Sequence, residues 1–232
     1  MVAIIWDAES KRLFEAGLDR GVLYPKNIKT KGYTTGVGWN GMTKVDESPE
    51  GGETTTKYAN NGAYLNLVSR EKFKGAISAY TYPPEWRQCD GSDTVSVAKP
   101  GGTTEKVPGL LVTSQTRRGF GLSYRTIIGN DTEQTDYGYL LHLVYNATAG
   151  VSSKSRETIN ENLDATEFSW NFDTTPADVP GMKPTAHLII SSLEADKTRL
   201  AKLEALLYGT ESAEPRLPDP AEVIAILGGT AG

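Results

Sequence analysis

Cysteine is nearly absent from this chain of 232 residues, which contains only Cys89. A single cysteine cannot form an intrachain disulfide, and it gives a metal ion no second thiolate. The sequence therefore excludes a disulfide framework and a cysteine-based zinc site, and nothing in it requires an oxidising compartment. We expect Cys89 to be a half-buried structural thiol.

Histidine is also scarce, since the chain contains only His142 and His187. Each lies inside a predicted strand, and no serine or cysteine nucleophile motif is near either of them. This pattern favours structural roles for both imidazoles over a catalytic triad or a metal centre. We therefore predict no catalytic residue and no metal site.

Phosphate-binding loops are missing although glycine is abundant, at 24 residues. No GxxxxGKS/T motif occurs. The stretch Gly36–Gly41 (GVGWNG) only partly matches a dinucleotide fingerprint, because it lacks the strand before it and the helix after it. Carboxylates are plentiful, but the sequence pairs none of them in a cleft as acid/base catalysis requires. We expect no cofactor and no enzymatic activity.

Basic residues are fewer than acidic ones, at 24 Lys and Arg against 29 Asp and Glu. The formal net charge is -5 and the isoelectric point is near 5.2. Proteins that grip a nucleic-acid backbone do so with clustered lysine and arginine, which release counterions from the phosphates. We therefore expect that nucleic acid, if it meets this protein, is not bound specifically.

Long hydrophobic runs are absent too. No stretch approaches the ~20 apolar residues of a membrane-spanning helix, and the first ten residues, MVAIIWDAES, lack the basic region and apolar core of a signal peptide. We expect a soluble protein that is synthesised in the cytoplasm and has no membrane partner.

Short runs rich in Val, Ile, Thr and Tyr recur from Tyr33 to Ile190, separated by clusters of Gly, Asn, Asp and Pro. This pattern predicts a mainly β fold, a sandwich or barrel of roughly eight to ten strands. Residues 120–128 and 137–145 flank a polar connector and should form an antiparallel hairpin. The clearest predicted strands are residues 64–69, 76–82, 110–113, 120–128, 137–145, 167–172 and 186–190. In residues 167–172 the rings of Phe168, Trp170 and Phe172 alternate with Ser169 and Asn171, so the three rings should share one buried face of the sheet.

Between Asn40 and Asn61 lies a segment with few apolar anchors and a bend at Pro49–Gly52, too long for an ordinary turn. We predict a protruding arm that becomes ordered when it docks on an adjacent subunit. The candidate subunit-interface residues are Trp39, Met42, Val45, Thr55 and Tyr58.

The C-terminal part changes character. Leu193, Leu200, Leu203 and Leu207 follow helical spacing, with Ser191 and Glu194 as a possible capping box and Gly209 as a stop. A second short helix should begin at Asp219-Pro220. We divide the chain into a β domain, residues 1–192, and a helical extension, residues 193–232, which we expect to be an exposed appendage.

Four stretches of the sequence resemble a known protein family. Residues 160–190 read NENLDATEFSWNFDTTPADVPGMKPTAHLII, and the others are GLDRGVLYP (17–25), AYTYPPEWRQCDG (79–91) and GFGLSYRTIIGND (119–131). In this order they resemble the major tail tube proteins of long-tailed, non-contractile bacteriophages. The resemblance extends over nearly the whole chain.

The resemblance implies a β-sandwich that forms hexameric rings, with strands from each subunit building a continuous inner β-barrel. The rings stack into the hollow virion tail that carries the genome into the host. It also implies contacts with a tape measure protein and a tail terminator. The host cytoplasm is then the place of synthesis.

Two other functions remain open. The tube protein of a contractile injection system has a similar architecture, although we recognise no comparable C-terminal extension there. A carbohydrate-binding β-sandwich could use its tryptophans to stack on sugar rings, but core or interface positions are more usual for tryptophans among apolar neighbours.

Overall fold

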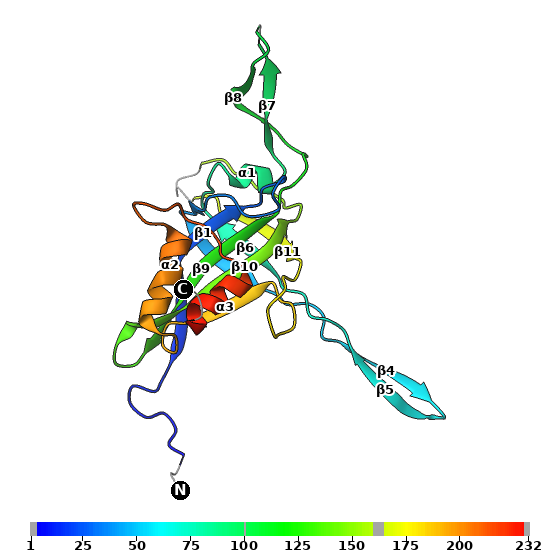
Figure 1. The fold of residues 1–232 in the computed structure, drawn as a ribbon, viewed down its shortest axis with the longest axis vertical. Coiled ribbons are helices and arrows are strands. Elements are labelled where there is room, and N and C mark those ends of the chain that lie inside the picture. Colours follow the sequence, from blue (N-terminus) through cyan, green and yellow to red (C-terminus); the bar gives the residue numbers. More distant parts are fainter. Residues whose placement is uncertain (1–3, 100, 160–164, 230–232) are drawn as a thin grey trace.

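The computed structural model describes residues 4–99, 101–159 and 165–229 and shows a mainly β protein, with three helices among these residues (Figure 1). The Asn162-Leu163-Asp164 part of the first resemblance block lies outside the described residues. The strands are β1 (Phe14–Pro25), β2 (Val37–Gly38), β3 (Met42–Glu47), β4 (Thr54–Ala59), β5 (Gly62–Val68), β6 (Lys74–Ala79), β7 (Asp93–Ala98), β8 (Thr104–Val112), β9 (Phe120–Asn130), β10 (Gln134–Ala149), β11 (Phe168–Thr174) and β12 (His187–Ser191). The helices are α1 (Trp86–Cys89), α2 (Lys197–Tyr208) and α3 (Pro220–Gly228).

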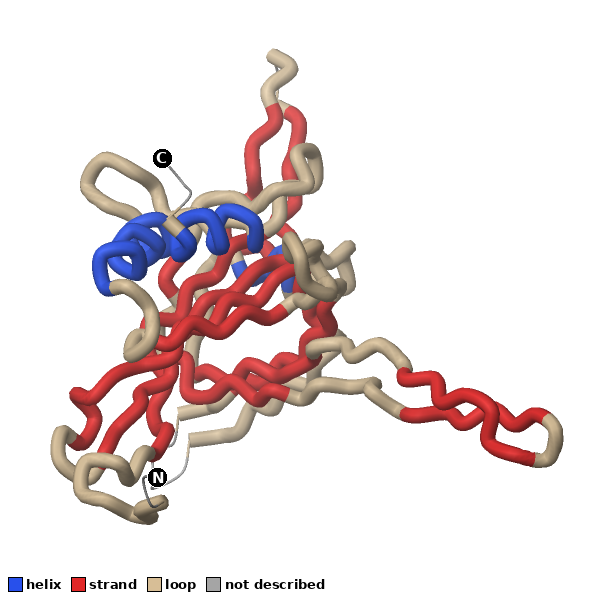
Figure 2. Tube along the Cα trace, turned by 60° about the horizontal axis from the view of Figure 1, so that its bottom comes forward, coloured by secondary structure: helices blue, strands red, loops and turns tan. Residues whose placement is uncertain are grey.

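The body is an antiparallel sheet of eight strands in the order β2-β1-β9-β10-β11-β6-β3, with β12 also paired to β10. At 16 residues, β10 is long enough to take two neighbours besides β9. Residues 140–144 pair with β12, and residues 147–149 pair with β11. The sheet divides at this point into two layers, which gives the β-sandwich-like arrangement in Figure 2.

The two ends of this sheet come together through one short segment. β2 and β3 follow each other in the chain but stand at opposite ends of the strand order. Between them, the Trp39 amide donates to the Gly21 carbonyl of β1 at 2.8 Å. The Tyr80 amide, just after β6, donates to the Gly41 carbonyl at the same distance. The segment therefore joins the two layers along one side.

Aromatic side chains fill the space between the layers. The predicted alternation in β11 is confirmed: Trp170 and Phe172 are buried, and Ser169 and Asn171 point outward. Period-two geometry places alternate residues on opposite faces, so the inward set packs with Trp39 and the other core rings. The buried core residues are Leu23, Trp39, Ile77, Ala79, Trp86, Cys89, Phe120, Leu122, Tyr124, Val144, Ala147, Ala149, Trp170 and Phe172.

Helices α2 and α3 cover the outer face of the β1-β9-β10 layer (Figures 1 and 2). Leu200, Leu203 and Leu207 are buried there against side chains of β1, β10 and β12. The Tyr24 hydroxyl of β1 donates to the Leu207 carbonyl at 2.8 Å. The prediction of an exposed appendage is therefore wrong, because this polar segment has one apolar stripe and the sheet offers a matching apolar face.

The helix starts were predicted with mixed success. Asp219 caps α3 as expected, accepting from the Glu222 amide at 2.8 Å. The capping box at Ser191 is wrong, because Ser191 is the last residue of β12 and pairs with Leu140. Asp196 caps α2 instead. Gly209 ends α2 as predicted. None of the described helices is long and apolar enough to cross a lipid bilayer.

The predicted hairpin of β9 and β10 is confirmed, and each of the seven predicted strands coincides with part of a strand. One long strand, β1, was missed. Its pairing with β9 shifts register after Ala16 and after Asp19, and Gly17 adopts a positive φ of 72°. Such bulges break the period-two pattern, so the sequence offers no clean alternation to recognise.

Candidate functional site

A two-stranded hairpin leaves the body between β3 and β6; we call residues 48–72 the first arm (Figure 1). At its tip Asn60 and Asn61 both have positive φ, which is the geometry of a tight type I′ hairpin turn. At its base Glu50 and Lys72 exchange backbone hydrogen bonds of 2.9 and 2.7 Å. The arm therefore spans residues 48–72 and not the predicted residues 40–61. Its predicted first part contains β3, which belongs to the body because it pairs with β6.

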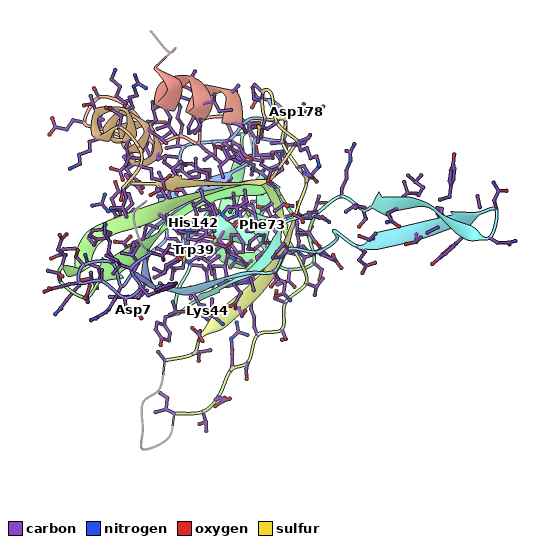
Figure 3. The ribbon with its side chains drawn as sticks, turned by 90° about the horizontal axis from the view of Figure 1, so that it is seen from below. Asp7, Trp39, Lys44, Phe73, His142 and Asp178 are labelled. Carbon is purple, nitrogen blue, oxygen red and sulfur yellow. The ribbon has the colours of Figure 1, made fainter. Side chains whose placement is uncertain are left out.

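The first arm carries large apolar side chains that are between about half and three-quarters exposed. Figure 3 shows the hairpin extending from the body with side chains on both of its faces. An isolated two-stranded hairpin is marginally stable in water, and a hydrophobic face normally needs a third strand or another layer. The exposed fractions are 74% for Tyr58, 75% for Tyr64, 48% for Leu65, 47% for Leu67 and 67% for Val68.

A second hairpin, β7 with β8, projects from the body in another direction; we call residues 93–112 the second arm (Figures 1 and 2). It too exposes apolar side chains. Residues 110–113 were predicted as a strand, and residues 110–112 belong to β8, which pairs with β7 and not with the main sheet. The sequence did not predict this arm, although Gly101-Gly102 is a turn signal. Its exposed apolar residues are Val95, Val97, Leu110, Leu111 and Val112.

The structure divides the five predicted interface residues into two groups. Thr55 and Tyr58 lie exposed on the first arm. Met42 and Val45 pack against the core from β3 and are partly buried. Trp39 is only 4% exposed and contacts Trp86 and Trp170 inside the body, so it has no surface to offer a partner and that prediction is wrong.

A separate cluster of polar side chains lies between the two layers of the body, where Figure 3 labels His142. It consists of Glu47 at the end of β3, His142 in β10 and His187 in β12. His142 Nδ1 lies 3.1 Å from His187 Nε2 and 3.3 Å from Glu47 Oε1. His187 Nδ1 lies 3.9 Å from Glu47 Oε2. We call these three residues the histidine cluster.

The surroundings hold the cluster firmly. The His142 ring stacks on Tyr124 at 4.6 Å between ring centroids, and the Tyr124 hydroxyl donates to Glu47 Oε1 at 2.6 Å. On the other side, His142 Nε2 lies 3.1 Å from the Thr126 hydroxyl. The side chains of His142 and His187 are 4% and 10% exposed, whereas that of Glu47 is 34% exposed.

Burial and hydrogen bonding set the charges of the cluster. Burial, which removes the hydration that an imidazolium needs, lowers the pKa of His187 to about 4. Hydrogen bonding with His142, aided by the Tyr124 hydroxyl, lowers the pKa of Glu47 to about 2 although burial opposes this. At neutral pH the cluster therefore contains a neutral His187 and an ionised Glu47.

Both histidines were predicted to have structural roles, and no metal site was predicted. The structure brings the two imidazoles together with a carboxylate, which the sequence could not show. The three residues lie far apart in the chain, and their meeting depends on β12 pairing with β10 and on β3 lying in the opposite layer. No local spacing motif signals such an arrangement.

No protein-family model matches the chain, and a search of the curated proteins finds no match either. The likeness to tail tube proteins therefore depends on the four sequence blocks.

Proposed function

We propose that this chain is the subunit of a tail tube, as its resemblance to the major tail tube proteins of long-tailed, non-contractile phages implies. Copies join side by side into hexameric rings, and the rings stack into the virion tail. The observation that carries the proposal is the pair of hairpin arms, which expose apolar side chains that a single copy cannot bury.

The partner of the arms is a second copy of the same chain. Hairpins with bare apolar faces gain stability when another sheet or chain covers them. Identical subunits supply matching surfaces in every copy, and a closed ring leaves no arm or edge unsatisfied. Two arms that leave the body in different directions can serve two kinds of contact, one within a ring and one between rings.

In the assembled tube, genomic DNA passes through the bore without specific binding, which fits a net charge of -5. The family resemblance adds a tape measure protein and a tail terminator as partners. In this proposal each subunit contributes strands to a continuous inner β-barrel, as the resemblance implies.

Deletion of the first arm tests the proposal. Residues 51–71 are replaced with Asn-Gly, so that Glu50 and Lys72, already a hydrogen-bonded pair, flank a two-residue turn. A second variant replaces residues 94–111 in the same way between the paired Asp93 and Val112. Concentrated wild-type protein should form tubes or rings in negative-stain electron micrographs, and each deletion variant should remain monomeric while melting cooperatively.

The matched control is Met182→Ser, which removes a side chain that is 75% exposed in the loop between β11 and β12. This variant should assemble like wild type. The proposal is contradicted if wild-type protein remains as isolated particles even with tail initiation proteins present, or if both arm deletions form tubes of normal length.

The carbohydrate-binding alternative receives little support from the structure. Trp39, Trp86 and Trp170 are 4%, 0% and 0% exposed, so they cannot stack on a sugar. Of the chain's four tryptophans, all of them among the described residues, Trp6 alone is exposed, at 76%. A single tryptophan outside the sandwich does not form a sugar-binding platform.

A further inference from the structure

The histidine cluster brings together more hydrogen-bond acceptors than its few N–H protons can satisfy. A neutral imidazole has one N–H donor and one lone pair. His142 Nδ1 faces both His187 Nε2 and a Glu47 oxygen, yet it carries at most one proton. The Glu47 carboxylate contributes further lone pairs at the same point. Several acceptors therefore converge where few protons are available.

From this geometry we infer that Glu47, His142 and His187 form a binding site for a divalent transition-metal ion, with Zn²⁺ as the best fit. Two imidazoles and a carboxylate, with a fourth position left to water, are a ligand set that zinc accepts in tetrahedral geometry. Imidazole ligands favour Zn²⁺ over Mg²⁺ and Ca²⁺, which prefer oxygen.

The distances agree with this assignment. Zinc binds imidazole nitrogen at ~2.0–2.1 Å, so neighbouring ligands of a tetrahedron stand roughly 3.3 Å apart. The distances from His142 Nδ1 to His187 Nε2 and to Glu47 Oε1 are 3.1 and 3.3 Å. The ligand atoms of all three residues lie within 4.8 Å of one another. The Glu47 side chain is 34% exposed, so this side of the cluster is accessible to solvent.

The hydrogen bonds around the proposed ligands also fit a metal site. Ligating histidines usually have their other ring nitrogen hydrogen-bonded, which orients the ring. His142 Nε2 has such a partner in the Thr126 hydroxyl at 3.1 Å, and that hydroxyl donates to Glu15 at 2.5 Å.

The site lies at the root of the first arm. Glu47 is the last residue of β3 before the arm, and Phe73, the first residue after it, packs on the His187 ring at 4.3 Å between centroids. A bound ion joins β3 in one layer to β10 and β12 in the other. It therefore holds the two layers together where the arm begins, independently of what the arm contacts.

Metal titration of the full-length chain tests this inference. Untagged protein, stripped with EDTA and dialysed, is titrated with ZnCl₂ in a calorimeter and with CoCl₂ in a visible spectrometer. We expect one equivalent of either metal per chain, and intense d–d bands typical of tetrahedral Co²⁺. At a hundredfold excess of Zn²⁺ over its Kd the melting temperature should rise by roughly 5–10 °C.

Two ligand variants and one control locate the site. Glu47→Gln and His187→Gln should each weaken Zn²⁺ binding at least about 10-fold. Glu53→Gln, an exposed glutamate at the base of the arm, should leave it unchanged. Unchanged affinity in both ligand variants overturns the inference, since the metal would then sit elsewhere. If a variant does not fold, the titrations of the wild-type chain provide the test. The inference is overturned if wild-type protein does not bind Zn²⁺, or if its Co²⁺ complex lacks tetrahedral d–d bands.

Discussion

Single buried rings contribute much of the stability of the body. Trp170 is fully buried, and its ring contacts Trp39, Trp86, Tyr82 and Phe168 at centroid distances between 5.4 and 5.8 Å. Aromatic side chains bury large apolar areas, and a cavity of that size closes poorly when the ring is removed. The stability of the sandwich should therefore depend strongly on this position.

We expect Trp170→Ala to lower the free energy of unfolding by about 3–5 kcal/mol. The measurement is chemical denaturation of the unassembled protein. Trp6→Ala is the matched control, because Trp6 is 76% exposed and its removal should change stability by less than ~0.5 kcal/mol. Equal effects of the two substitutions would show that Trp170 is not packed as described.

An ion pair on the outer side of the sheet links β1 with β9. Arg125 donates to both carboxylate oxygens of Asp19, at 2.9 and 2.6 Å, and its guanidinium lies 4.4 Å from the centroid of the Tyr139 ring. These hydrogen bonds lower the pKa of Asp19 below its usual value of 3.8. The ionised carboxylate is thus more favourable in the folded protein than in the unfolded chain.

The pair should make stability depend on pH in acid. A carboxylate with a lowered folded pKa contributes stability above its unfolded pKa, near 3.8, and this is lost as pH falls through the folded value. Between about pH 5 and pH 2, the free energy of unfolding should therefore fall less steeply in Asp19→Asn than in wild type. Denaturant titrations across this range measure the slope, with the exposed Asp178→Asn as control. Parallel slopes for Asp19→Asn and wild type would contradict the assignment.

At the level of elements, the C-terminal helices depend on caps and one apolar stripe. Helix α3 has nine residues, too few to be stable alone. It buries Val223 against the sheet, and Asp219 satisfies an amide at its first turn. Arg216 adds two hydrogen bonds, at 2.7 and 2.5 Å, to the carboxylate of Glu222. Packing and capping together hold this helix in place.

Asp219→Ala should lower the free energy of unfolding by about 1 kcal/mol, because it leaves the Glu222 amide without its acceptor. Asp219→Asn keeps an acceptor oxygen and should retain most of the stability. Thermal and denaturant melts of the two variants supply the comparison. Equal losses in both would indicate that the charge of Asp219 matters and the cap does not.

For the whole molecule, the proposed tube must let a polyanion pass. Each cation paired with a phosphate strengthens binding and slows the passage of DNA. We propose that the polar surfaces of the strands lining the bore are acidic on balance, in keeping with the net charge of -5. A structure of the tube with a bore lined by lysine and arginine would refute this.

Assembled tubes should retain no double-stranded DNA at physiological salt, and retention at low salt should be weak. Filter binding or sedimentation of tubes with labelled DNA, repeated at several salt concentrations, measures this. A basic DNA-binding protein of similar size provides the positive control. Tight retention that falls steeply with rising salt would indicate a cationic bore and contradict the proposal.

Local patterns predicted much of the element content. The alternation of Phe168, Trp170 and Phe172 indicated an inward aromatic face, and Asp219-Pro220 marked the start of α3, since both signals depend on neighbours in the chain. Where bulges interrupt the alternation, as in β1, the signal failed. The candidate site was predicted only in part: Thr55 and Tyr58 lie exposed on the first arm, whereas Trp39, which was predicted at a subunit interface, is buried among the core rings.

The sequence by itself determined that the protein is mainly β, acidic and capped by short helices at its C-terminal end, because composition, periodicity and capping are local properties. Only the tertiary structure decided which strands pair, that α2 and α3 cover the sheet, that two hairpins leave the body, and that His142 and His187 meet Glu47. These features depend on contacts between distant segments, and the free energy of such contacts is set by packing that no short stretch of sequence encodes.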